Sequence, residues 1–366
     1  FLDPPLESVQ IPEEDREIFY EVFPDLKRYP GDRVPRMVWQ QLYTTKVYLP
    51  MLEMLDRKFA IPPLHEDLSI AMNSSYFRSS TTFDNRQWMD IRGVGSGATV
   101  IEYVERGAHL ERNVTLHEYV HLFHGMLFSD QEMRRVQAKK EDRVLDYYAA
   151  NNEFEYLAQA IPAYFSAQTV HPLNHKAANV RTDLSIKDPE MYAWVDSLIT
   201  KHRRYQEGEW MALSRNWAKA YLELAKKARI SQDSMLVSYL DSAMRWDSTY
   251  VPTYLAYADH WMGKGDWEKA NQWIKQAEEL APNFAPVDLA RAKWYEKQLD
   301  KKEIFEETAI RAISEAYQKA TDKEKDRRLS AAINQAQRIF YMDYSLWQDA
   351  LETAEAYLLD PPTFST

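Results

Sequence analysis

The stretch Thr115-Leu-His-Glu-Tyr-Val-His-Leu-Phe-His-Gly125 governs the interpretation of the whole chain, because it contains the pattern His-Glu-x-x-His. Residues four apart lie on one face of an α-helix, so His117 and His121 point in the same direction. Two imidazoles at that spacing can bind one zinc ion, and Glu118 can take a proton from a water beside the metal. The interleaved apolar residues predict a buried helix over residues 113–128.

A second predicted helix, residues 143–167, supplies candidates for a third zinc ligand. Glu153 and Glu155 lie about 200° apart around a helix axis, so both cannot face one metal. On a continuous helix Glu155 shares a face with Tyr148 and Asn152, which favours Glu155 and leaves Glu153 as the alternative. Two histidines and one glutamate keep a fourth position open for water, as catalytic zinc sites require.

Composition excludes several classes of protein. The net charge of −11 over 366 residues argues against a nucleic-acid partner. There is no Cys, and therefore no disulfide framework, cysteine zinc site or thiol nucleophile. No apolar run approaches the roughly 20 residues that cross a bilayer. The chain begins with Phe1, which fits an exported protein (periplasmic, lipoprotein or secreted) after removal of a leader, with a cytoplasmic location as the alternative.

Ahead of the active-site helix the pattern predicts helices over residues 13–29 and 38–59, followed by a small twisted sheet. Residues 95–101 are a candidate for an edge strand that pairs with an extended substrate, and an ordinary core strand is the alternative. The expected strands are Leu68–Met72, Tyr76–Phe77, Trp88–Ile91 and Ala98–Val104.

From about residue 205 onward the sequence becomes repetitive. Val251–Phe284 spans 34 residues and resembles a tetratricopeptide repeat in its small residues, in Gly265 at the turn and in Pro282 at the end. Three or more such units form a stable stack, and an unrelated helical bundle is the alternative. Degenerate copies are predicted at residues 217–250, 285–318 and 330–362.

The run His117-Glu-Tyr-Val-His-Leu-Phe-His-Gly125 resembles the active-site helix of gluzincin metallopeptidases, especially the bacterial collagenases. Glu155-Tyr-Leu-Ala-Gln-Ala160 resembles the ligand helix of the anthrax lethal factor and Pro-Pro endopeptidase type, with Gln159 where those enzymes have an acid. The resemblance covers about 50 residues and implies that Glu155 binds zinc. It also implies that Tyr148 stabilises the oxyanion, with Tyr147 as the alternative if the helix register differs.

The sequence therefore predicts a mostly α protein with a small β-sheet: a zincin-like α+β metallopeptidase domain over residues 1–204 and an α-helical, tetratricopeptide-like domain over 205–366. Zn²⁺ is expected on His117, His121 and Glu155, with Glu118 as general base and Tyr148 as oxyanion donor.

The expected substrate of this zinc metalloendopeptidase is a peptide or protein, and the repeats are a candidate surface for a protein partner. His124 is expected to be a buried side chain, with a substrate contact as the alternative. Two other functions stay open. One is a repeat-based binding scaffold with an inactive or structural peptidase-like half, and the other is a zinc hydrolase of non-peptide amides.

Overall fold

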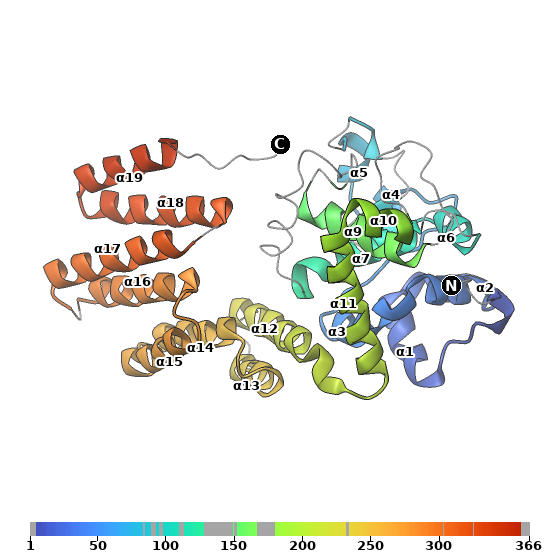
Figure 1. Ribbon diagram of the computed structural model, residues 1–366, viewed down its shortest axis with the longest axis horizontal. Coiled ribbons are helices and arrows are strands. Elements are labelled where there is room, and N and C mark those ends of the chain that lie inside the picture. Colours follow the sequence, from blue (N-terminus) through green and yellow to red (C-terminus); the bar gives the residue numbers. More distant parts are fainter. Residues whose placement is uncertain are drawn as a thin grey trace. The chain divides into compact units, whose positions relative to one another are not determined.

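The computed structural model is mostly helical in the part of the chain that it describes, which confirms the prediction of a mostly α protein (Figure 1). The chain forms two compact units, residues 1–216 and 217–366, and the boundary falls inside helix α12 (Ser214–Ser231). None of the described helices combines the length and apolar character that crossing a bilayer demands. The described residues are 5–82, 85–88, 93–94, 98–109, 113–127, 149, 152–166, 180–231, 234–302, 304–324 and 326–359.

The first unit consists of helices of varied length joined by short 3₁₀ turns and one small hairpin of strands. The strands β1 (Gly93–Val94) and β2 (Ala98–Thr99) are antiparallel, with Val94 opposite Ala98. The helices are α1 (Glu13–Val22), α2 (Arg33–Gln41), α3 (Leu49–Met54), α4 (Leu68–Ala71), α5 (Tyr76–Ser79), α6 (Ile101–Ala108), α7 (Val114–Leu127), α9 (Glu153–Phe165), α10 (Arg181–Lys187) and α11 (Pro189–Gln206).

Helix α7, which carries the His-Glu-x-x-His pattern, lies in the aromatic core of this unit. The fully buried ring of Tyr119 stacks on Phe23 with centroids 5.7 Å apart, and Phe123 packs against Tyr48 at 4.6 Å. Each large aromatic side chain removes about 150–250 Å² of apolar surface from water, so these contacts fix the rotation of α7 about its axis. The predicted helix over 113–128 is therefore confirmed nearly to its bounds.

The expected sheet is wrong at several described positions. Residues 68–71 and 76–79 are helical turns. Asp67 caps the first of them by accepting hydrogen bonds from the N–H groups of Ser69 and Ile70. Most of the strand expected over 98–104 is helix α6, in which Ile101, Val104 and Ala108 recur at helical spacing. Of the proposed edge strand, residues 95–97 lie outside the described residues, and β2 pairs with β1 and bridges to Ala60.

The two long helices expected elsewhere in this unit are not continuous in the described residues. Residues 38–59 divide into the end of α2, a 3₁₀ segment over Tyr43–Tyr48 and α3. The helix that carries Glu155 begins at Glu153, because Asn152 is extended (φ −165°, ψ 172°) and caps it, and residues 143–148, 150 and 151 of the expected helix lie outside the described residues. Asn152 therefore does not share a helical face with Glu155, and the argument from one continuous helix is wrong at this point.

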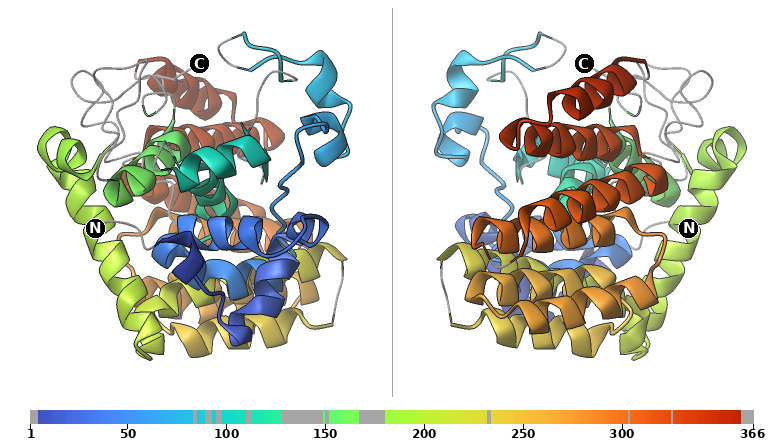
Figure 2. Two further views of the ribbon diagram at one scale, coloured as in Figure 1. Left: turned by 90° about the vertical axis from the view of Figure 1, so that its right-hand side faces the viewer. Right: turned by 90° about the vertical axis from the view of Figure 1, so that its left-hand side faces the viewer.

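The second unit is built from helical hairpins that follow one another in chain order, as the change from gold to red shows in Figure 2. Helix α14 packs on α15, α16 on α17 and α18 on α19, and small buried residues such as Ala258, Ala277 and Ala292 allow the close approach. The helices are α12, α13 (Leu236–Trp246), α14 (Val251–Lys264), α15 (Trp267–Leu280), α16 (Ala285–Asp300), α17 (Glu306–Lys323), α18 (Arg327–Asp343) and α19 (Trp347–Leu359).

The 34-residue stretch Val251–Phe284 coincides with the hairpin of α14 and α15. Gly265 ends α14 in the left-handed region, with φ +76°, where residues with a Cβ are strained. The next residue, Asp266, caps α15 through the N–H of Lys269. Gly265 therefore lies at the turn, as the sequence predicts, while the identity of the repeat as a tetratricopeptide unit remains a prediction.

Candidate metal centre

The N-terminus of α7 is held by a chain of buried amides. Asn113 Oδ1 accepts a hydrogen bond from the N–H of Leu116 at 2.8 Å, and its Nδ2 donates to the Gln41 carbonyl at 2.9 Å. The Gln41 side chain in turn donates to the Val104 carbonyl at 2.8 Å. These bonds tie α2, α6 and α7 together and fix the height of the histidines within the unit.

His117 and His121 lie one turn apart on α7, and both present Nε2 to the same point. The two Nε2 atoms are 3.2 Å apart. Glu155 on α9, which packs against α7, brings Oε2 to 3.2 Å from His117 Nε2 and 3.6 Å from His121 Nε2. The structure thus brings together the three side chains that the sequence proposes as metal ligands.

This triangle of atoms fits a tetrahedral metal. Zinc bonds of about 2.0–2.1 Å separate neighbouring ligand atoms by about 3.3 Å, close to the three measured distances. The donor set is also right, because two neutral imidazoles and a carboxylate suit Zn²⁺. Glu155 Oε2 is buried and accepts no well-aligned hydrogen bond from the described residues, and such an atom is stabilised by a cation.

A second carboxylate lies at the same point. An oxygen of the largely buried Glu118 and one ring nitrogen each of His117 and His121 all lie within 4.8 Å of one another. Glu155 Oε2, at 3.2 Å and 3.6 Å from the two imidazole nitrogens, is at a separation that suits a metal ligand, and Glu118 lies beside these atoms. A general base needs that position, near a metal without occupying its coordination sphere.

The charges of the centre favour cation binding. Burial alone would raise the pKa of Glu155, but His117 and His121 outweigh burial and lower it below its ordinary value. Glu155 is therefore ionised at neutral pH. Burial lowers the pKa of His121, but its contact with Glu155 and the charge of Glu118 together reverse this and raise it. Protons and a metal consequently compete for the same imidazole lone pair.

Glu155 is positioned by groups that the sequence analysis did not assign to the site. Asn152 Oδ1 accepts hydrogen bonds from the N–H groups of Phe154 and Glu155 itself, both at 2.9 Å. The hydroxyl of the adjacent Tyr156 donates to buried Asp188, which caps α11 through the N–H of Met191. An Asn three residues before a Glu at a helix start is a capping signal that was available in the sequence.

The remaining predicted residues have different outcomes. Tyr148 and its alternative Tyr147 lie outside the described residues, so the oxyanion donor stays a prediction. His124 is fully buried and packs on the ring of Phe154, with centroids 4.5 Å apart, which agrees with a buried side chain between α7 and α9. Glu153 is buried at the first position of α9, whereas Glu155 supplies the oxygen near both histidines.

Comparison of the chain with protein-family models, with curated proteins and with solved structures finds no significant match. The case for a function therefore depends on the residues and geometry of the site alone.

Proposed function

We propose that the protein is a zinc-dependent metallopeptidase whose metal is held by His117, His121 and Glu155. The observation that carries this proposal is the convergence of the two Nε2 atoms and Glu155 Oε2, 3.2–3.6 Å apart, from two separate helices. A bound zinc in this setting supplies a Lewis acid and a water of lowered pKa.

Glu118 performs the proton transfers in this proposal. Its carboxylate takes the proton of the attacking water and returns it to the leaving amine, so one residue serves as base and then as acid. Glu118 is buried beside the two histidines, and this burial limits the access of bulk water to its carboxylate. Tyr148, the predicted oxyanion donor, would stabilise the negative charge of the tetrahedral intermediate.

The test compares metal content with hydrolysis in one variant. Glu118→Gln keeps the size of the side chain and all three ligands, so it should retain zinc at the wild-type stoichiometry. It should lower the turnover of a quenched fluorescent peptide library by at least about a hundredfold, because general base catalysis is lost. Turnover equal to that of the wild type would contradict the role of Glu118.

The same measurements separate the peptidase from the two alternatives. A binding scaffold with an inactive half would give no hydrolysis by the zinc-loaded wild type. A hydrolase of non-peptide amides would cleave a small acyl-amide panel but not the peptide library. In both cases the metal site could be intact, so zinc content must be measured in parallel with activity.

A further inference from the structure

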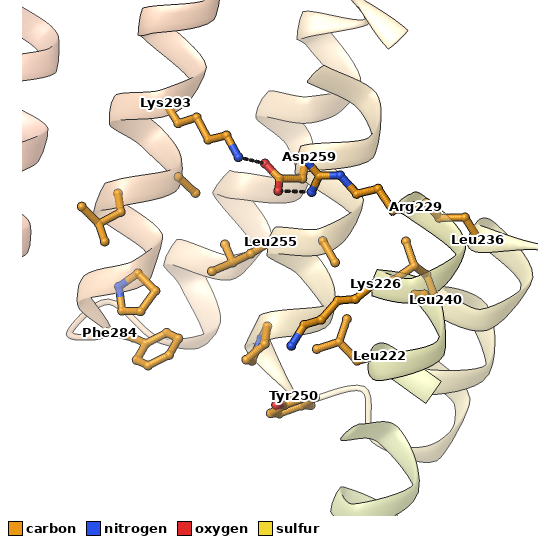
Figure 3. A pocket seen from close by; sticks show the side chains of 16 residues that line it. Leu222, Lys226, Arg229, Leu236, Leu240, Tyr250, Leu255, Asp259, Phe284 and Lys293 are labelled. Carbon is orange, nitrogen blue, oxygen red and sulfur yellow. Dashed lines mark hydrogen bonds and ion pairs between the residues drawn. The ribbon is translucent and has the colours of Figure 1, made fainter. Parts of the chain in front are cut away.

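The second unit contains a hollow of about 530 Å³ that is independent of the metal centre (Figure 3). It is lined by residues of α12, α13, α14 and α16 and by the segments that lead into α14 and α16. This volume lies within the range of about 300–1,000 Å³ found for ligand sites. The hollow spans successive helical hairpins, and its size therefore suits a segment of chain and not a single ion.

The floor of the hollow is apolar. Leu222, Leu240 and Leu255 lie along its middle, and Tyr250 and Phe284 lie at its lower side in Figure 3. Leu255, Tyr250 and Phe284 are only partly buried, so their apolar surface remains in contact with water. Covering it with apolar side chains of leucine size would be favourable, because moving each such side chain out of water lowers the free energy of the system.

Charged groups border this floor, and most of them are cationic. Asp259 accepts hydrogen bonds from Arg229 at 2.5 Å and from Lys293 at 2.7 Å, which fixes both cations at one side of the hollow (Figure 3). Lys226 lies below them in Figure 3, and its Nζ donates a hydrogen bond to Glu223 at 2.5 Å, outside the lining, while its side chain stays 59% exposed. The lining residues thus carry three positive charges and one negative charge, in a chain whose net charge is −11.

The two cations on Asp259 retain hydrogen-bonding capacity. An arginine has five N–H donors and a lysine has three, and the contact with Asp259 uses one of each. Their side chains are 55% and 40% exposed, so the remaining donors are accessible to a ligand. A carboxylate placed there would gain charge-assisted hydrogen bonds to groups that are already held in place.

We propose that this hollow binds a polypeptide segment in which leucine-sized side chains are separated by Asp or Glu residues. The apolar floor takes the leucines, and Arg229, Lys293 and Lys226 contact the carboxylates. Neighbouring packed helices lie about 8–10 Å apart, so the distance from α12 through α14 to α16 corresponds to about six extended residues. A nucleic acid fits less well, because Asp259 would face its phosphates and the leucines would face its sugars.

The experiment measures fluorescence anisotropy of the full chain with a fluorescein-labelled nonapeptide of three Leu-Glu-Glu repeats. EDTA is present throughout, so that binding is measured without metal and without cleavage. The outcome is thus independent of the proposed peptidase activity. The acidic peptide should bind saturably, and a nonapeptide of three Leu-Lys-Lys repeats should bind at least about tenfold more weakly.

The double variant Lys226→Gln/Lys293→Gln should weaken binding of the acidic peptide at least about tenfold. Its matched control is Lys275→Gln/Lys301→Gln, which removes the same charge from exposed positions outside the lining and should leave affinity unchanged. Circular dichroism checks that both variants are folded. If the double variant unfolds, Lys226→Gln alone, at a side chain 59% exposed, serves the same comparison.

Three results would overturn the proposal. The first is equal affinity for the acidic and basic peptides, and the second is an equal loss of affinity in Lys226→Gln/Lys293→Gln and in its control. The third is tighter binding of a labelled nine-nucleotide single strand than of the acidic peptide.

Discussion

Two buried tyrosines near the metal centre differ in what their hydroxyl groups contact. Tyr119 on α7 is fully buried, and its hydroxyl has no hydrogen-bond partner in the described part of the chain. Tyr156 on α9 is also buried, but its hydroxyl donates to Asp188. A buried polar group without a partner costs free energy, whereas a satisfied one contributes about 1 kcal/mol.

The variant Tyr119→Phe should therefore raise the free energy of unfolding by about 1 kcal/mol, because it removes an unsatisfied hydroxyl and keeps the ring. Tyr156→Phe is the matched control and should lower it by about 1–3 kcal/mol, because Asp188 loses a donor. Urea unfolding of both variants and the wild type measures these two changes in the free energy of unfolding. Equal destabilisation by the two substitutions would contradict this account of Tyr119.

His202 on α11 makes the stability of the first unit depend on pH. It is fully buried, Tyr48 Oη lies 2.7 Å from its Nε2, and Thr44 Oγ1 lies 3.2 Å from its Nδ1. Burial, together with the charge of Lys201, lowers the pKa of His202 to about 3. The unfolded chain takes up this proton near pH 6.5, so it binds more protons than the folded chain between pH 6.5 and 3.

The stability that His202 contributes should therefore be fully present above pH 6.5 and be lost as the pH falls towards 3, by about 1 kcal/mol per pH unit. Urea unfolding at pH 7, 6 and 5 in the presence of EDTA measures the slope. His202→Gln removes the titrating group, so its slope should be smaller than that of the wild type by this amount. Parallel slopes would show that His202 does not titrate as proposed.

At the scale of the elements, the start of α9 connects a helix cap to the candidate metal centre. Asn152 caps this helix through the N–H of Glu155, so the cap holds the backbone of a proposed ligand. Asn152→Ala should cost about 1 kcal/mol of stability. It should also weaken zinc affinity about tenfold, because Glu155 is no longer held within reach of both imidazoles.

Asp266→Ala provides the comparison for this prediction, because Asp266 caps α15 in the second unit through the N–H of Lys269 at 3.1 Å. The two variants should lose similar stability in urea unfolding, but only Asn152→Ala should lose zinc affinity in a competition titration with a chelator. A similar change of zinc affinity in both variants would show that the cap of α9 has no specific effect on the metal centre.

Helices α7 and α9 show which parts of the candidate site could be predicted from the sequence. Helix α7 could be predicted because its apolar residues and the pair His117 and His121 recur at helical spacing. The prediction of one continuous helix through Glu155 is wrong at Asn152, because Asn152 was treated as a helical face residue and not as a cap. Glu155 was still predicted as the partner of the histidines, because Glu155-Tyr-Leu-Ala-Gln-Ala160 resembles a known ligand helix.

At the scale of the whole molecule, the high helix content could be anticipated from periodicity, and the hairpin of α14 and α15 from its turn residues. The small sheet could not be placed, because short apolar runs such as Leu68–Ala71 have no periodicity that distinguishes a strand from a helical turn. The hollow on the second unit was also missed. Arg229, Asp259 and Lys293 are about 30 residues apart in sequence, and only packing of α12, α14 and α16 brings them together.

The central claim is that His117, His121 and Glu155 hold one divalent metal, and zinc stoichiometry after exhaustive dialysis tests it most directly. Wild-type protein and Glu153→Gln should each retain about one zinc per chain by plasma mass spectrometry, because a site with three protein ligands binds zinc tightly. His117→Ala, His121→Ala and Glu155→Gln should each retain less than about a tenth of that amount. Wild-type protein without zinc, or full retention in Glu155→Gln with loss in Glu153→Gln, would contradict the account.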